Sequence, residues 1–125
     1  MNNNTNNFNV SEYLNNIDTI YLFFSGGLDS SALLIWLNKI ATKNKKELIT
    51  LELSMNTKRN NLELEARKRV KQYLHLTNLE TIKVDITNSQ IINPNGGKAQ
   101  LTLYIELFYP FLKDKSILTF GIHSG

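Results

Sequence analysis

The hydrophobic positions of the chain alternate between continuous runs typical of buried strands and the three-to-four-residue spacing typical of helices. Thr19 to Phe24 is a β-branched and aromatic run followed by a serine and two glycines, which predicts a central strand buried on both faces. Asp29 to about Thr42 is apolar almost all round, which predicts a helix packed on a sheet. Glu47 to Leu53 is the second predicted strand.

The second half of the chain continues this alternation. Asn60 to His75 has an apolar stripe and a basic opposite face, which predicts a surface helix. Leu79 to Ile86 alternates apolar and polar residues, which favours a half-exposed edge strand. After a loop, Lys98 to Leu112 has helical spacing, and Ser116 to Phe120 is a last short strand. This order predicts an α/β fold, a Rossmann-like parallel sheet of about four strands with helices on both faces.

Residues 1–17 are predicted to form an arm and a short helix outside the main domain. Six of residues 2 to 9 are Asn, which is too polar a stretch to join a core. Ser11 can cap a short helix through about Asn16, with Tyr13 and Leu14 available to dock on the body. The remainder, residues 18–125, is then one domain. The aromatic side chains expected in its core are Trp36, Tyr104, Phe108 and Tyr109.

Composition excludes several chemistries. The 125 residues contain no cysteine, which excludes disulfides, cysteine-bound zinc, iron–sulfur clusters and thiolate nucleophiles in this sequence. His75 and His123 alone cannot build a zinc site, so none is expected. The net charge of +3 gives little support for a nucleic-acid partner. No apolar run could span a bilayer and no secretory signal is visible, so we expect a cytoplasmic protein with no membrane partner.

The segment SGGLDSS, Ser25 to Ser31, lies between the first predicted strand and helix. Two adjacent glycines let the backbone turn sharply and approach a ligand. The helix that follows offers free N–H groups to an anion, so phosphate is the expected ligand. The Ser25 and Ser30 hydroxyls can add donors, and Asp29 can hold a metal ion or cap the helix. The alternative is an ordinary turn with Asp29 as N-cap. Chance would give S-G-G-x-D-S in roughly one chain of this length in ten thousand, which favours the functional interpretation.

Ligands of parallel sheets bind outside the carboxyl ends of the strands, where the strand order reverses. Several polar residues follow the other predicted strands at this edge, with exposed loop positions as the alternative interpretation. The expected nucleotide contacts there are Ser54, Gly121 and His123. The expected anion or substrate contacts are Lys58, Asn95 and Lys98.

The run from Ser25 to Ser30 resembles the SGGxDS signature of the PP-loop ATP pyrophosphatases, which stands intact here. The resemblance implies a HUP-type fold and cleavage of ATP between its α and β phosphates. It also implies that the loop holds ATP and magnesium, with Asp29 and Ser30 as catalytic residues and Asp29 as the magnesium ligand. The nucleotide contacts implied in this loop are Ser25, Gly26, Gly27, Leu28, Asp29, Ser30 and Ser31.

Within this superfamily the chain is most similar to 7-cyano-7-deazaguanine synthase of queuosine biosynthesis. The likeness rests on the loop, on a helix around NLELEARKR and on the final GIHSG. It covers about Thr19 to Gly125 and corresponds to the N-terminal half of a typical member, so residues 18–125 are expected to be a truncated PP-loop domain. It implies an AMP-forming ligase that adenylates a small carboxylate for attack by ammonia.

Two departures from that family keep other functions open. The second strand is followed by Ser54 to Lys58, where the family has an aromatic and acidic segment, and the sequence stops before the family's zinc-binding cysteines. One alternative is a non-catalytic or split nucleotide-binding module, such as those of antiviral-defence systems, whose site a partner chain or a second copy completes. Another is a different PP-loop ligase, such as an amidotransferase or a tRNA-modifying enzyme.

Overall fold

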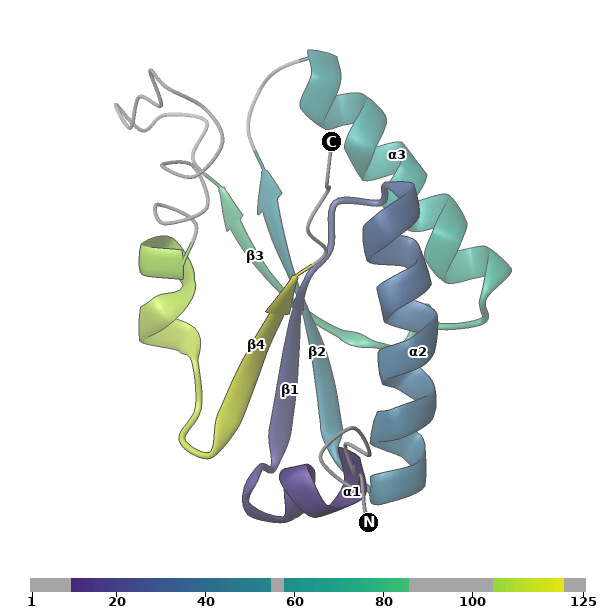
Figure 1. The fold of residues 1–125 in the computed structure, drawn as a ribbon. Helices are drawn as coiled ribbons and strands as arrows, with labels where there is room; N and C mark the ends of the chain where they lie inside the picture. The colour runs from purple at the N-terminus through teal and green to yellow at the C-terminus, as the bar shows by residue number, and fades with distance from the viewer. Residues whose placement is uncertain (1–9, 55–57, 86–104, 121–125) are drawn as a thin grey trace, which may run out of the picture.

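The computed structural model describes residues 10–54, 58–85 and 105–120. They form a four-stranded sheet in the order β3-β2-β1-β4, in which all neighbouring strands are parallel. The strands are β1 (Thr19–Phe23), β2 (Glu47–Ser54), β3 (Glu80–Asp85) and β4 (Ser116–Phe120). The predicted α/β Rossmann-like sheet is therefore confirmed, with β1 in its interior and β3 at one edge (Figure 1).

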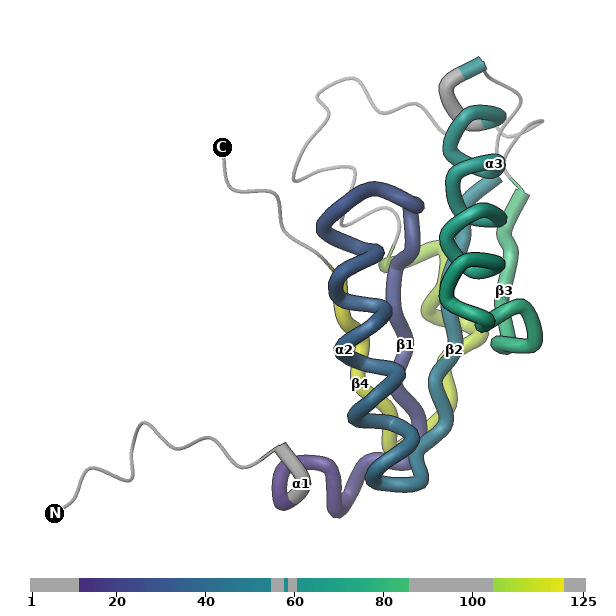
Figure 2. The backbone as a smooth tube through the Cα atoms, turned by 90° about the vertical axis from the view of Figure 1, so that its right-hand side faces the viewer, coloured from purple at the N-terminus to yellow at the C-terminus, as the bar shows by residue number. Residues whose placement is uncertain are grey.

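Helices cover both faces of this sheet (Figures 1 and 2). Helices α2 (Leu28–Asn44) and α3 (Lys58–Tyr73) lie on one face. On the other face lies a helical segment, residues 105–111, whose last turn is the 3-10 helix η3 (Tyr109–Phe111). The short helix α1 (Val10–Tyr13) and the 3-10 turn η2 (Leu14–Asn16) precede β1.

Alternating strand residues build two separate cores, because successive side chains point to opposite faces. Ile20 and Leu22 of β1 pack under α2 against Leu34. Tyr21 faces the other side and packs against Phe108 of the helical segment. The Tyr21 hydroxyl also accepts a hydrogen bond of 2.9 Å from the backbone N–H of Lys113, so β1 is tied to the chain that leads into β4.

The prediction for the core aromatics is confirmed at one position and wrong at two. Phe108 is fully buried, but 52% of Trp36 and 71% of Tyr109 is exposed. Trp36 is exposed because α2 covers the sheet with one side only, although its sequence is apolar almost all round. Tyr109 begins the 3-10 turn, whose tighter winding directs it away from the core. Tyr104 lies outside the described residues.

The strand order reverses between β1 and β4. Helices α2 and α3 carry the chain from β1 outward to β3, and the chain then returns to the opposite side of β1 to form β4. In open parallel sheets, ligands bind at the carboxyl ends of the strands beside such a reversal. The segment that leaves the carboxyl end of β1 is Phe24 to Gly27.

Candidate functional site

Phe24 to Gly27 connects the carboxyl end of β1 to the N-terminus of α2 (Figure 1). Gly26 has a φ of +89°, a conformation that side-chain-bearing residues rarely adopt. Gly27 is the N-cap residue of α2 and has an extended backbone. Because glycine has no side chain, the N-cap supplies no acceptor to the N–H groups of the first turn. The helix N-terminus is therefore suited to an anion.

Two hydroxyl groups hold the shape of this loop. The Ser25 and Ser30 oxygens are 3.1 Å apart, and the Gly27 N–H donates to Ser25 Oγ at 3.3 Å. Ser30 Oγ lies 3.3 Å from the Gly27 carbonyl oxygen, to which it can donate. Ser30 is buried and Ser25 is exposed. Ser30 thus braces the turn from inside, while Ser25 is open to a ligand.

The remaining loop residues sit in the first turn of α2. Asp29 is exposed there, and the interpretation of Asp29 as N-cap is wrong because Gly27 occupies that position. A carboxylate in a first turn interacts favourably with the helix dipole. Leu28 is exposed. The Ser31 backbone N–H donates to the Gly27 carbonyl at 2.9 Å, while its buried hydroxyl has no hydrogen-bond partner among the described residues.

The other predicted contacts fall into two groups. Ser54 is half-buried at the end of β2, and Lys58 is exposed at the start of α3, so both lie at the same edge of the sheet as the loop. The rest fall outside the described residues and remain predictions; these are Asn95, Lys98, Gly121 and His123.

Helix α3 packs directly on the loop at Gly26. A Cβ atom on Gly26 would lie 2.9 Å from both the backbone nitrogen and the Cγ atom of Arg67, and 3.2 Å from the Cβ atom of Ala66. Real Cβ atoms do not approach backbone atoms this closely. Glycine is therefore required at this position both by its φ angle and by the space that α3 leaves.

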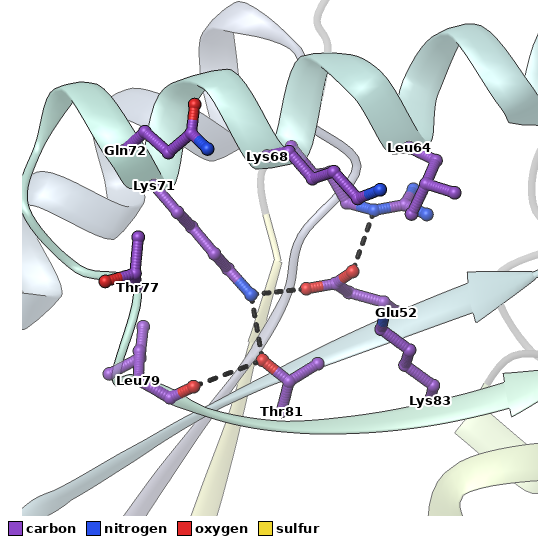
Figure 3. A pocket seen from close by; sticks show the side chains of 10 residues that line it. Glu52, Leu64, Lys68, Lys71, Gln72, Thr77, Leu79, Thr81 and Lys83 are labelled. Atoms are coloured by element: carbon purple, nitrogen blue, oxygen red, sulfur yellow. Dashed lines mark hydrogen bonds and ion pairs between the residues drawn. The ribbon is translucent and has the colours of Figure 1, made fainter.

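Beneath α3 lies a cluster of buried charges that the sequence analysis missed (Figure 3). Glu52 of β2 and Arg67 of α3 are both buried, and Arg67 Nε donates to Glu52 Oε1 at 2.9 Å. Lys71 Nζ donates to Glu52 Oε2 at 2.5 Å and to the hydroxyls of Thr50 and Thr81 at 3.1 and 2.8 Å. One carboxylate thus holds two cations of the same helix.

A signal for this cluster was present in the sequence. Glu52 stands between Leu51 and Leu53 in an otherwise apolar strand, and a charge at such a position needs a partner when it is buried. The partner could not be identified from the pattern, because Arg67 lies on the helix face that periodicity assigns to solvent. The two side chains meet only because α3 packs against β2.

Two clefts of about 350 Å³ each open on the α2 and α3 side of the sheet. The first is lined mainly by charged and polar side chains of α3 and β3, Lys68 and Lys83 among them, and its wall includes Glu52 and Lys71 of the buried cluster (Figure 3). The second is apolar and lies between η2, α2 and β4, with Tyr13, Trp36 and Ile117 in its wall. Neither cleft is formed by the loop residues.

Among the residues described, no group of three or more His, Asp or Glu side chains could hold a metal ion. Magnesium in nucleotide sites is commonly held by one or two carboxylates together with substrate phosphates. Asp29, exposed beside a helix N-terminus that suits phosphate, fits that arrangement. In the same described part of the chain, no helix is long and apolar enough to cross a membrane.

Comparison with known families assigns the chain. Residues 19–99 match the family described as Queuosine biosynthesis protein QueC, over more than half of the sequence. The chain belongs to the QueC family. This confirms the resemblance drawn from SGGLDS, because QueC is a PP-loop family of queuosine biosynthesis. No curated protein was found to match the chain.

The matched region includes the elements that surround the candidate site. It runs from β1 through the SGGLDS loop, α2, β2, α3 and β3, and therefore includes both the loop and the buried Glu52–Arg67 pair. The match ends before η3 and β4. The family assignment thus rests on the same elements that surround the candidate site.

Proposed function

We propose that the chain binds ATP at Ser25 to Ser31 and forms AMP, as a ligase of the 7-cyano-7-deazaguanine synthase kind. The supporting observation is the position of SGGLDS at the carboxyl end of β1, where the strand order reverses and the N-terminus of α2 is open to an anion. Membership of the QueC family supports the choice of ATP over other phosphate ligands.

In the proposed reaction, an oxygen of a small carboxylate substrate attacks the α-phosphorus of ATP. The bond between that phosphorus and the bridging oxygen breaks, and pyrophosphate leaves with the bonding electrons. Ammonia then attacks the activated acyl carbon, loses a proton, and displaces AMP. The first step builds negative charge on the departing pyrophosphate, which donors fixed in advance stabilise best.

The residues of the loop would divide this work. The N–H groups of the first turn of α2 and the exposed Ser25 hydroxyl would bind the pyrophosphate portion of ATP. Ser30 would keep the turn in shape from its buried position. Asp29 would hold magnesium, which neutralises phosphate charge when it is bound.

A second candidate is a module that binds ATP without turning it over. It is favoured by the residues from the end of β2 to the start of α3, Ser54 to Lys58, which lack the aromatic and acidic residues that the synthases carry there. The two candidates share the loop and differ in whether AMP is formed. A partner chain or a second copy that completes the site belongs to this second candidate.

The test is AMP release from labelled ATP with magnesium, ammonium and 7-carboxy-7-deazaguanine. Asp29→Ala is compared with Asp18→Ala, which removes an exposed carboxylate before β1, at the opposite edge of the sheet. We expect AMP from the wild type and from Asp18→Ala, and at least a hundredfold less from Asp29→Ala at an unchanged melting temperature. Bound ATP without AMP would favour the module, and absence of ATP binding would contradict both candidates.

A further inference from the structure

The buried ion pair of Glu52 and Arg67 stands directly behind the loop and has no part in the chemistry described above. We propose that this pair positions the phosphate loop, by holding helix α3 against Gly26 so that the loop keeps the shape that binds ATP. The inference rests on the proposed ATP function, and it adds two positioning residues to it.

The contact between the loop and α3 is made at Arg67 itself. Of the three atoms nearest to a Cβ built on Gly26, two belong to Arg67 and the third to the neighbouring Ala66. One of the two is the Arg67 backbone nitrogen, which cannot move unless the helix moves. A displacement of α3 at Arg67 therefore changes the space in which Gly26 holds its φ of +89°.

Glu52 fixes Arg67 from the side of the sheet. The two side chains are each 4% exposed, and Nε and Oε1 are 2.9 Å apart. Glu52 follows Leu51 in β2. The carbonyl of Leu51 accepts a hydrogen bond of 3.0 Å from the backbone N–H of Phe24, which is the residue before Ser25. Phe24, Leu51, Glu52, Arg67 and Gly26 thus form a closed ring of contacts around the start of the loop.

A buried charge pair suits this role better than apolar contacts would. The hydrophobic effect is non-directional, so apolar burial alone specifies the position of a helix on a sheet less sharply than a hydrogen-bonded charge pair does. A carboxylate with one oxygen on Arg67 and the other on Lys71 specifies both the position and the rotation of α3. Buried ion pairs are weak sources of stability, and in some proteins buried polar or ionic groups specify one arrangement among several.

Lys71 provides a matched control within the cluster. Like Arg67 it is a cation of α3 that donates to Glu52, but its Nζ lies 5.6 Å from the centroid of the Phe24 ring, one turn of helix beyond the atoms nearest Gly26. Arg67→Met and Lys71→Met each remove one cation from the same carboxylate. Only the first removes an ion pair made by the residue whose atoms lie nearest Gly26, and methionine keeps the backbone nitrogen and the Cγ atom that meet the loop.

The experiment measures the Kd of a non-hydrolysable ATP analogue with magnesium, well below the melting temperature of each variant, together with the amide NMR signals of Gly26 and Gly27. We expect Arg67→Met to raise the Kd at least tenfold and to shift both amide signals. Lys71→Met should change the Kd less than threefold and leave the signals in place. A purely structural role would lower the melting temperature and change the Kd in proportion for both variants, and that result would overturn the proposal.

A second pair of variants covers the case in which Arg67→Met does not fold. Glu52→Gln keeps the shape of the side chain and weakens its hold on Arg67, whereas Glu47→Gln does the same to an ion pair with Lys113 near the other end of β2. Only Glu52→Gln should shift the glycine amides and raise the Kd. If the wild type binds no ATP, the proposed function fails, while unshifted Gly26 and Gly27 signals in Glu52→Gln would separately refute positioning.

Discussion

Gly26 and Gly27 are neighbours in the chain, yet only the first lies where a side chain cannot be accommodated. Gly26 combines a φ of +89° with atoms of Arg67 only 2.9 Å from where a Cβ would stand. Gly27 has a φ of −74°, and its Cβ would meet only Ser25 Oγ, at an ordinary 3.5 Å. The backbone of the first position thus depends on having no side chain, while that of the second does not.

We predict that Gly26→Ala lowers the free energy of unfolding by about 2–4 kcal/mol, from backbone strain and from overlap with α3. Gly27→Ala, the matched control, should change it by less than about 1 kcal/mol, because alanine fits its backbone conformation. Urea denaturation followed by circular dichroism measures both. Equal losses for the two variants would mean that α3 does not press on Gly26.

How far single residues could be predicted depended on how far apart their partners lie in the sequence. The loop residues are consecutive, so their spacing alone predicted the turn before α2. The partner of Glu52 lies 15 residues away on another element, and no local pattern relates the two. Residues such as Arg67 are identified only once the packing of helix on sheet is known.

At the scale of elements, the helical segment 105–111 places two adjacent aromatic side chains in different surroundings, one in the core and one in solvent. Phe108 is fully buried, and its ring meets that of Phe23 edge-to-face, with centroids 5.3 Å apart. Tyr109, the next residue, begins the 3-10 turn and is exposed. Phe108 therefore anchors the segment to the sheet, and Tyr109 contributes little to that packing.

We expect Phe108→Ala to lower the free energy of unfolding by about 3–5 kcal/mol, because it leaves a cavity in a fully buried position. Tyr109→Ala should change it by less than about 0.5 kcal/mol. Thermal unfolding of the two variants beside the wild type gives the comparison. A large loss at Tyr109 would show that its ring packs against part of the protein in solution.

The existence and type of the described elements followed from periodicity, but several ends did not. Helix α2 starts at Leu28 because Gly27 can serve as N-cap, and it ends at Asn44 because Lys45 takes a left-handed conformation. Such ends are set by one or two backbone angles, which hydrophobic spacing does not encode. The segment predicted from Lys98 is described from residue 105 onward.

At the scale of the whole molecule, the two ends of the sheet carry different chemistry. The carboxyl ends of the strands carry the loop, whereas Glu47, Glu80 and Lys113 meet near the amino ends of β2 and β3. The hydrogen bond from Lys113 lowers the pKa of Glu47 and raises the pKa of Lys113. A hydrogen bond to Glu47 raises the pKa of Glu80 above its ordinary value of 4.5.

These shifts act on stability in opposite directions. A lowered pKa at Glu47 contributes stability that is lost as the pH falls, while a raised pKa at Glu80 contributes stability that is lost as the pH rises through it. We predict that Glu80→Gln melts about 1 °C above the wild type at pH 7, where two carboxylates otherwise repel, and at the same temperature near pH 4. Melting curves between pH 4 and pH 7 test this prediction, with Glu65→Gln as an exposed control. A difference in melting temperature between Glu80→Gln and the wild type that does not vary with pH would contradict it.

The sequence predicted that the strands are parallel and that the third strand lies at an exposed edge, because few topologies are compatible with alternating strands and helices. The strand order was not predicted, since it depends on whether the chain leaving β3 returns past β1. That return creates the reversal beside the loop, and so the location of the site is a property of the whole topology.

The apolar cleft beside α2 also has a consequence for spectroscopy. Trp36, the only tryptophan of the chain, lies half-exposed in its wall, eight residues after Leu28 and so about 12 Å along the helix from the loop. Its fluorescence therefore reports the polarity around that cleft and not the occupancy of the phosphate loop. A blue shift of its emission would mark the arrival of another apolar surface on this face, independently of ATP.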